Sequence, residues 1–206
     1  MKQEELKMDK AAMYKLSYGL FVLTAKEGEK DNGCIINTAM QVTTTPNRIV
    51  IVVNKANYTH DMIMRTKEFN VSCLSESAKF DVFQHFGFQS GKDVDKMEGK
   101  SYPRAENGIV YVDDVANAYI SGKVVSETDL GTHTMFLADV IDAKVLDVEP
   151  SVTYTYYQQN IKPAPQAAKK AGWVCKICGY VYEGEELPED YICPICKHPA
   201  SDFERL

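Results

Sequence analysis

The sequence predicts a mostly β protein that carries a small metal-binding module at its C-terminal end. Short runs of β-branched and aromatic residues recur between residues 19 and 148, and Gly, Asn, Asp and Pro separate them, which is the pattern of antiparallel strands. Four of the six cysteines lie within residues 173–206. Cysteines grouped in this way predict a compact metal site rather than a disulfide framework.

Seven apolar runs are the expected strands of an antiparallel sheet or barrel. They cover residues 19–25, 34–36, 49–53, 69–74, 108–112, 118–125 and 135–148. A polar stretch over residues 37–46 carries too many hydroxyl and amide side chains for a strand in the core. We therefore expect this stretch at a sheet edge, where such groups can hydrogen-bond a ligand.

Three segments have the apolar spacing of helices. They cover residues 3–16, 58–66 and 77–86, and Thr59 is the expected N-cap of the second. The side chains expected to face the core are Leu6, Ala12, Met13, Leu16, Met62, Ile63, Phe80, Val82 and Phe83.

The composition predicts two domains of unequal size. Residues 162–172 contain no large apolar side chain, so we expect them to link an N-terminal domain, residues 1–161, to a C-terminal module, residues 173–206. The module holds seven acidic and three basic residues, a net charge of −4. The whole chain has a net charge of −6, which argues against general binding to nucleic-acid phosphates.

The N-terminal segment predicts a cytoplasmic protein. It is charged throughout and lacks the apolar stretch of a secretory signal. The longest aliphatic run, residues 49–53, is far shorter than a membrane span requires. In a reducing compartment, paired cysteines bind metal or do redox chemistry more often than they form structural disulfides.

The strongest chemical signal is a pair of Cys-x-x-Cys motifs, Cys175 with Cys178 and Cys193 with Cys196. Each motif lets one tight turn present two thiolates to a single ion, and two facing turns complete a tetrahedral shell. Zinc and iron both accept this shell, so the spacing leaves both ions open. Gly179 follows the first motif and allows backbone N–H groups to turn toward the sulfurs, which tunes a redox potential.

The residues around these cysteines resemble the rubredoxin family. The matching segments read CGYVYEG, LPEDYICPIC and SDFE, and the resemblance covers residues 173–206. It implies one iron that is bound by the four cysteines and carries one electron. Lys197 departs from the family, which usually has glycine after the last cysteine.

The N-terminal domain contains the elements of a nucleotide-like ligand site. Lys55 and several short polar side chains lie at the expected start of the second helix, where free N–H groups and the helix dipole favour a phosphate. An exposed Thr-rich strand followed by an ordinary capped helix is the alternative. No GxGxxG motif follows a strand, and no Glu stands three residues before any of the four histidines, which argues against a Rossmann domain and a di-iron bundle.

Four segments resemble the flavin reductase family of FMN-binding split barrels. They read NTAMQVTTTP, IVIVVNKANYTHDMI, EFNVSCL and GTHTMFLADVIDAKVL, and the resemblance covers residues 8–150. It implies a split β-barrel that binds FMN, accepts a hydride from NAD(P)H and forms a homodimer with FMN near the interface.

The resemblance also implies roles for individual residues. The side chains expected along the isoalloxazine ring and ribityl chain are Asn37, Thr38, Gln41, Val42, Thr43 and Thr44. Those expected at the phosphate are Asn54, Lys55, Asn57 and Thr59. His133 is the expected catalytic residue, facing flavin and nicotinamide, and Thr132 stands where the family usually has an acidic residue.

The remaining histidines and cysteines have less specific expectations. His60 is expected in the phosphate loop or on the helix surface, His85 beside neighbouring phenylalanines, and His198 in solvent. Cys34 and Cys73 lie in strand-like runs and are expected as small buried apolar residues.

Together the two domains predict a converter between hydride transfer and single-electron transfer. Electrons would pass from NAD(P)H to FMN, then to the iron centre, then to an external acceptor. The arrangement resembles the family of high molecular weight rubredoxins, which implies a flavodiiron protein as acceptor, and an acidic module would suit a basic docking patch. Two alternatives are a reductase that supplies reduced flavin or reduces ferric complexes, and a zinc-holding interaction module.

Overall fold

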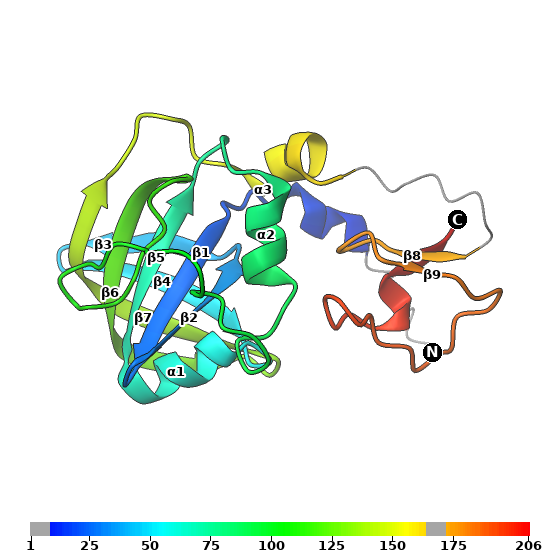
Figure 1. The fold of residues 1–206 in the computed structure, drawn as a ribbon, viewed down its shortest axis with the longest axis horizontal. Helices are drawn as coiled ribbons and strands as arrows, with labels where there is room; N and C mark the ends of the chain where they lie inside the picture. Colours follow the sequence, from blue (N-terminus) through cyan, green and yellow to red (C-terminus); the bar gives the residue numbers. More distant parts are fainter. Residues whose placement is uncertain (1–8, 164–171) are drawn as a thin grey trace, which may run out of the picture.

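The computed structural model describes residues 9–163 and 172–206. A strongly curved sheet makes up most of the N-terminal domain, and the C-terminal module lies beside this domain (Figure 1). Leu6 and most of the predicted linker fall outside the described residues. Within the described ranges, no helix has the length and apolar character that a membrane crossing needs.

The large sheet has seven antiparallel strands in the order β2-β1-β5-β6-β7-β4-β3. The strands are β1 (Phe21–Glu27), β2 (Lys30–Ile36), β3 (Ala39–Thr44), β4 (Asn47–Asn54), β5 (Glu68–Leu74), β6 (Ala116–Asp129) and β7 (His133–Val145). The polar stretch predicted at a sheet edge forms β3, the last strand in this order. Six of the seven predicted apolar runs fall within or overlap these strands.

The predicted strand over residues 108–112 is wrong. Only an isolated bridge between Arg104 and Val110 occurs there. Side chains of the sheet bind this segment instead, because the Thr24 hydroxyl donates to the Val110 carbonyl at 2.5 Å and the Asn70 amide donates to the Ile109 carbonyl at 2.8 Å. The segment is therefore buried and apolar without joining a ladder.

The helices are α1 (Tyr58–Thr66), α2 (Phe80–Gly87) and α3 (Tyr154–Tyr156), with a π-helical turn, η2 (Tyr157–Ile161), directly after α3. Asn57, not the predicted Thr59, is the N-cap residue of α1. Thr59 lies inside the first turn, where its hydroxyl accepts a hydrogen bond from Asn32. α2 begins later than predicted because the Ser75 hydroxyl bonds Ser77 and the Val115 carbonyl, which holds the preceding residues in a turn.

The predicted N-terminal helix is not an α-helix in the described residues. A 3-10 segment, η1 (Lys10–Lys15), occupies part of its range. Met13 and Leu16 have 56% and 55% of their surface exposed, and Ala12 is exposed as well, so their predicted inward orientation is wrong. So short a helix is not stable without an apolar face to bury, and these side chains bury none.

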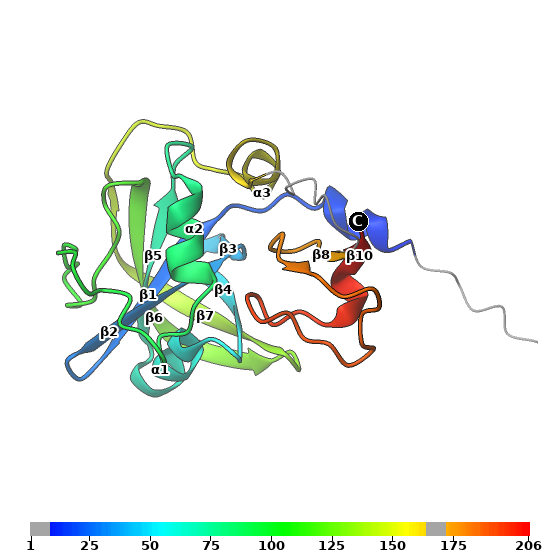
Figure 2. The same cartoon turned by 45° about the vertical axis from the view of Figure 1, so that its right-hand side comes forward.

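The described residues form three apolar cores. The first lies inside the curved sheet and is closed by Met62 and Ile63 of α1. The second lies under α2, where Phe83 and Phe86 contact Tyr157 and Val152 from the end of the N-terminal domain. In Figures 1 and 2, α2 lies on the side of the sheet that faces the C-terminal module, and α1 lies across the lower end of the sheet.

The C-terminal module has its own three-stranded sheet and its own core. The strands are β8 (Trp173–Cys175), β9 (Val181–Tyr182) and β10 (Phe203–Arg205), in the order β10-β8-β9, and a 3-10 turn, η3 (Ala200–Asp202), precedes the last. Cys175, Cys193 and Phe203 form the buried centre of this core. Two of these three side chains are predicted metal ligands, so the core is built around the cysteine site.

Candidate functional site

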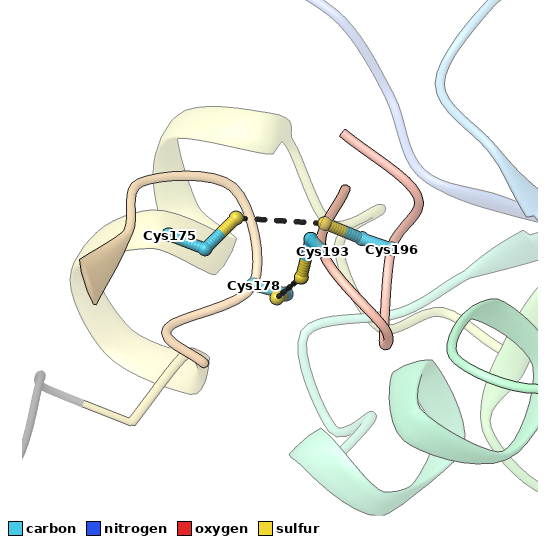
Figure 3. A group of neighbouring side chains, drawn as sticks. All are labelled: Cys175, Cys178, Cys193 and Cys196. Carbon is cyan, nitrogen blue, oxygen red and sulfur yellow. Dashed lines mark hydrogen bonds between the residues drawn. The ribbon is translucent and has the colours of Figure 1, made fainter. Parts of the chain in front are cut away.

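The four cysteine sulfurs of the C-terminal module converge on one point. All four lie within 4.8 Å of one another. Sulfur–sulfur distances of 3.5 Å join Cys175 to Cys196 and Cys178 to Cys193, so each turn faces the other (Figure 3). Metal–sulfur bonds of about 2.3 Å place tetrahedral sulfurs about 3.8 Å apart. The cluster therefore fits a single tetrahedral ion.

The two cysteine turns have matching backbones. The Gly179 N–H donates to the Cys175 carbonyl at 2.8 Å, and the Lys197 N–H donates to the Cys193 carbonyl at 2.9 Å. Both residues have positive φ, 79° at Gly179 and 62° at Lys197. The lysine that replaces the usual glycine thus adopts the same left-handed conformation, which is unfavourable for a residue with a Cβ.

Backbone N–H groups surround the sulfurs. Those of Ile177 and Cys178 reach Cys175, that of Tyr180 reaches Cys178, and that of His198 reaches Cys196. Each of these bonds favours the thiolate over the thiol. Donors of this kind tune the reduction potential of an iron that four thiolates hold.

The cluster favours ionisation at one sulfur. A hydrogen bond from the Cys196 thiol, helped by the Tyr180 N–H, lowers the pKa of Cys178 to about 5 against the effect of burial. The same contact raises the pKa of Cys196, because its thiol is the donor. A metal cation would complete the ionisation, since bound cysteines are thiolates.

A cavity of about 770 Å³ lies between the N-terminal domain and the C-terminal module. The N-terminal domain contributes residues of β2, the segment from the end of β4 to the start of α1, the segment that follows α2, and the start of β7. The module contributes the second cysteine turn, residues 194–199, including the ligand Cys196. One end of the cavity therefore lies next to the metal site.

Some of the predicted flavin-binding residues line this cavity and others do not. Asn54, Asn57, Thr59 and His133 line it together. Lys55 does not, because its ammonium pairs with Asp129 at 2.6 Å.

The predicted residues of β3 and of the turn before it lie elsewhere. Gln41 lines a second, smaller cavity and donates to Asn47 at 2.8 Å. The other residues are half-buried or exposed outside the larger cavity: Asn37, Thr38, Val42, Thr43 and Thr44. One chain thus brings together three of the four residues expected at the phosphate, Asn54, Asn57 and Thr59. The residues expected along the flavin ring do not join them, because β3 lies at the edge of the sheet.

His133 lies at the start of β7 and is half-buried. Its Nδ1 atom is 2.8 Å from the Thr132 hydroxyl, so Thr132 serves as its hydrogen-bond partner in place of a carboxylate. Burial lowers the pKa of His133, and the nearby His198 of the module lowers it further. Both effects favour the neutral imidazole.

Lys96 is a buried cation at the cavity that sequence reasoning missed. Its side chain is only 3% exposed. Its ammonium donates to the Gly33 carbonyl at 2.9 Å and to the Phe86 carbonyl at 2.8 Å, and burial lowers its pKa. Lys96 lies in a segment without periodicity, so no local signal distinguishes it from a surface lysine.

Asn32 is a second residue that only the tertiary structure reveals. Its amide donates to the Thr59 hydroxyl at 2.9 Å across the cavity floor. A Cβ on Gly91 would stand 2.0 Å from the Asn32 Oδ1 atom, so glycine is needed there for the segment after α2 to close on the floor. Strands disfavour Asn, so Asn32 gave no local indication that it lies in a strand or that its side chain points to a ligand site.

The other three histidines form contacts within the protein. His60 is buried, with its ring nitrogens 2.9 Å from the Thr134 hydroxyl and 3.1 Å from Asp61, so neither its phosphate-loop nor its surface placement holds. His85 packs edge-on against Phe86, as predicted. His198 is part-exposed and pairs with Asp202 at 2.9 Å.

Cys34 and Cys73 are unreactive by their surroundings. Burial raises the pKa of Cys34, and it raises that of Cys73 to about 11. Both side chains therefore stay protonated near neutral pH. Cys34 is buried as predicted, whereas Cys73 is only half-buried.

Comparison with known families matches both parts of the chain. Residues 13–165 match the family described as flavin reductase like domain. Residues 173–204 match the rubrerythrin, rubredoxin-like domain. The four-cysteine geometry and this second match together support iron as the ion of the cluster, and the first match supports a flavin.

Individual relatives agree with this division. The chain is 34% identical to high molecular weight rubredoxin of Moorella thermoacetica, over 97% of this chain and 100% of that protein. It is 37% identical to a ferric-chelate reductase (NAD(P)H) of Archaeoglobus fulgidus, over 73% of this chain and 89% of that one. Among solved structures, an NADH:FAD oxidoreductase of Streptomyces globisporus superposes with a TM-score of 0.64 at 22% identity, covering 74% and 93% of the two chains.

Proposed function

Because this chain belongs to the flavin reductase-like family and, along almost its whole length, to the high molecular weight rubredoxins, we propose that it converts hydride transfer into single-electron transfer. In the proposed reaction, NAD(P)H donates a hydride to FMN, and the electrons then leave one at a time through the four-thiolate iron. A flavin supplies the two-electron acceptor and the iron supplies the one-electron outlet. The proposed domains are residues 1–161 and 173–206, joined by residues 162–172.

The cavity that both parts line is the observation that carries this proposal. Asn54, Asn57 and His133 reach it from one side and Cys196 from the other. A flavin held by the N-terminal domain would therefore lie next to an iron ligand, without an intervening layer of protein. Such closeness is what direct electron transfer between the two groups requires.

The phosphate of FMN has a suitable environment at the start of α1. The N–H groups of a first helical turn lack intrahelical partners and attract anions. Asn54 and Asn57 add amide groups, and Lys96 adds a buried cation at the cavity wall. We propose that the exposed β3 residues Gln41 to Thr44 complete the ring site in a homodimer with FMN near the interface.

His133 is proposed to face the flavin and the nicotinamide. Its burial favours the neutral ring, and the Thr132 hydroxyl fixes the ring orientation at Nδ1. The other ring nitrogen is then available to hydrogen-bond a ligand in the cavity. The proposed role of His133 is thus to orient the reacting rings and to hold a proton at that nitrogen.

A basic redox protein, such as a flavodiiron protein, is the proposed acceptor. The loop between β9 and the second cysteine turn carries exposed acidic side chains: Glu183, Glu185, Glu186, Glu189 and Asp190. This loop lies on the side of the module that faces away from the N-terminal domain (Figures 1 and 2). An acidic outer face speeds encounter with a positively charged partner.

A visible spectrum of the purified protein tests the proposal. We expect flavin and ferric-thiolate bands together, and both should bleach when NADH is added without oxygen. Zinc in place of iron would contradict the electron relay. Iron that stays ferric while the flavin is reduced would instead support the second candidate, a reductase of ferric complexes, which the similarity to the ferric-chelate reductase favours.

The substitution Cys193→Ala separates the two half-reactions. Cys193 is fully buried and is one of the four clustered cysteines. We expect its loss to abolish electron delivery to an acceptor protein and to leave flavin reduction by NADH largely intact. The matched control is Cys73→Ala, which removes a thiol outside the cluster. Equal loss of flavin reduction and electron delivery in Cys193→Ala would contradict the proposed division of labour.

A further inference from the structure

Lys162 connects the N-terminal domain to the first cysteine turn. It follows directly on η2, and its ammonium donates to the carbonyl of Lys176 and to that of Ile177, both at 2.9 Å. These two carbonyls belong to the two residues between the ligands Cys175 and Cys178. The helical segment that precedes Lys162 passes behind this turn in Figure 3.

The charge of Lys162 is not neutralised by a carboxylate. In the described residues, no Asp or Glu oxygen forms an ion pair with its ammonium, and the side chain is half-buried. Burial opposes its charge and lowers its pKa, whereas the negative charge that Cys178, Cys175 and Cys196 carry when ionised favours the charge of Lys162. The negative groups that act on this cation are therefore sulfurs of the four-cysteine cluster, which are thiolates when they hold a metal ion.

Four thiolates around iron carry one net negative charge in the ferric state and two in the ferrous state. A nearby cation stabilises the more negative state, and it does so more strongly where solvent is partly excluded. The two hydrogen bonds also fix the position of the cation relative to the turn, because a lysine held by two carbonyls has little freedom to withdraw.

We propose that Lys162 is a positioning residue that docks the first cysteine turn against the N-terminal domain and biases the iron centre toward its ferrous state. A more favourable ferrous state would assist electron uptake from the flavin, and this consequence alone rests on the proposed function. The contact itself joins two parts of the chain whatever the electron donor is.

The test is the midpoint potential of the iron in the purified protein. A redox titration that monitors the ferric-thiolate absorption band measures this potential. Lys162→Met should shift the ferric–ferrous equilibrium toward ferric at least threefold, which equals about 28 mV for a one-electron couple. Lys162→Arg keeps the charge and the hydrogen-bond donors, so its midpoint potential should stay close to that of the unsubstituted protein.

Two controls separate the contact from net charge. Lys176→Met removes a charge from the same turn but from an exposed side chain, and Lys79→Met removes one from the exposed start of α2. Both should change the potential less than Lys162→Met does. A potential in Lys162→Met that equals that of Lys79→Met, or an equal shift in Lys176→Met, would overturn the inference.

Hydrogen exchange gives a readout that does not depend on iron redox chemistry. Amides of the first cysteine turn should exchange faster in Lys162→Met than in the unsubstituted protein, and amides of the second turn should change less. This comparison can be made with zinc in the site. Unchanged exchange in the first turn would contradict the docking role. Failure of the proposed function looks different, because the potential would still depend on Lys162 while NADH failed to reduce the iron.

Discussion

At the scale of single residues, the two cysteine turns make a matched pair for measuring backbone strain. Gly179→Ala places a Cβ at φ 79° with no neighbouring atom within 4 Å, so the only penalty is the left-handed conformation. We expect it to destabilise the metal-bound module by about 1 kcal/mol. Denaturant unfolding, followed by the metal–thiolate absorbance, measures the change.

The second turn should respond in the opposite direction. Lys197→Gly relieves the strain at φ 62° and should stabilise the module, by less than about 1 kcal/mol because glycine also frees the unfolded chain. Lys176→Gly is the control, since Lys176 has no positive φ and its replacement should only destabilise. Destabilisation in Lys197→Gly equal to that in Lys176→Gly would contradict the strain argument.

His133 predicts part of the acid sensitivity of the protein. Burial, followed by the charge of His198, places its folded-state pKa below the unfolded value of about 6.5. The folded protein therefore binds fewer protons here than the unfolded chain does, and the free energy of unfolding decreases as the pH falls through about 6.5. His133→Gln should flatten this part of the stability profile. Imidazole titration by NMR would contradict the prediction if His133 titrated above 6.5.

At the scale of elements, the segment between α2 and β6, residues 88–115, is held to β2 by an ion pair. The Arg104 guanidinium donates to both carboxylate oxygens of Asp31, at 2.9 and 2.7 Å, and the Asp31 side chain is only 8% exposed. Arg104→Gln would leave that carboxylate without its partner. We expect a loss of about 1 to 3 kcal/mol in denaturant unfolding.

Arg48→Gln is the matched control for this prediction. Arg48 pairs with Asp139 at 2.7 Å, and both side chains are more than a third exposed. Exposed pairs contribute less than about 1 kcal/mol. If both variants lost the same stability, burial of Asp31 would not explain the strength of the Arg104 contact.

Sequence patterns predict those elements that are determined by residues close together in the chain. Two Cys-x-x-Cys motifs contain both the ligands and the turn that presents them, so the sequence alone predicts the cluster. The polar stretch that became β3 was assigned to an edge from composition alone. The apolar run at residues 108–112 was misassigned, because the groups that bind its carbonyls, Thr24 and Asn70, are far away in the chain.

The cavity depends on contacts that no local pattern contains. Lys96 reaches the Gly33 carbonyl 63 positions away, and the second cysteine turn lines the same cavity as the start of α1, which is far away in the sequence. The expected phosphate residues could be found because they surround the start of one helix. The floor of the cavity and its closure by the module could not, since they arise only when distant segments pack.

At the scale of the whole molecule, the module should depend on its metal for folding. Its buried apolar side chains, within residues 172–206, are Val174, Cys175, Cys193 and Phe203, and two of these are predicted ligands. So small a core does not support a stable fold alone, and tetrahedral thiolate sites contribute folding energy directly. Removing the metal with a chelator in mild denaturant should expose the amides of residues 173–205 to hydrogen exchange.

The N-terminal domain should withstand the same treatment. Its core lies inside the seven-stranded sheet and contains no residue of the module. Amides of β1 and β5 should therefore keep their protection after the metal is removed. Cooperative loss of protection in both parts would show that the module stabilises the sheet, contrary to this expectation.

The position of the second cysteine turn has a kinetic consequence under the proposed function. Residues 194–199 line the same cavity as His133, so a nicotinamide bound beside His133 would share that cavity with the second cysteine turn, and we expect hydride uptake and electron release to compete there. Electron delivery to an acceptor should then pass through a maximum and decline as NADH is raised, while flavin reduction simply saturates. Excess donor would act as an inhibitor of the pathway that it supplies.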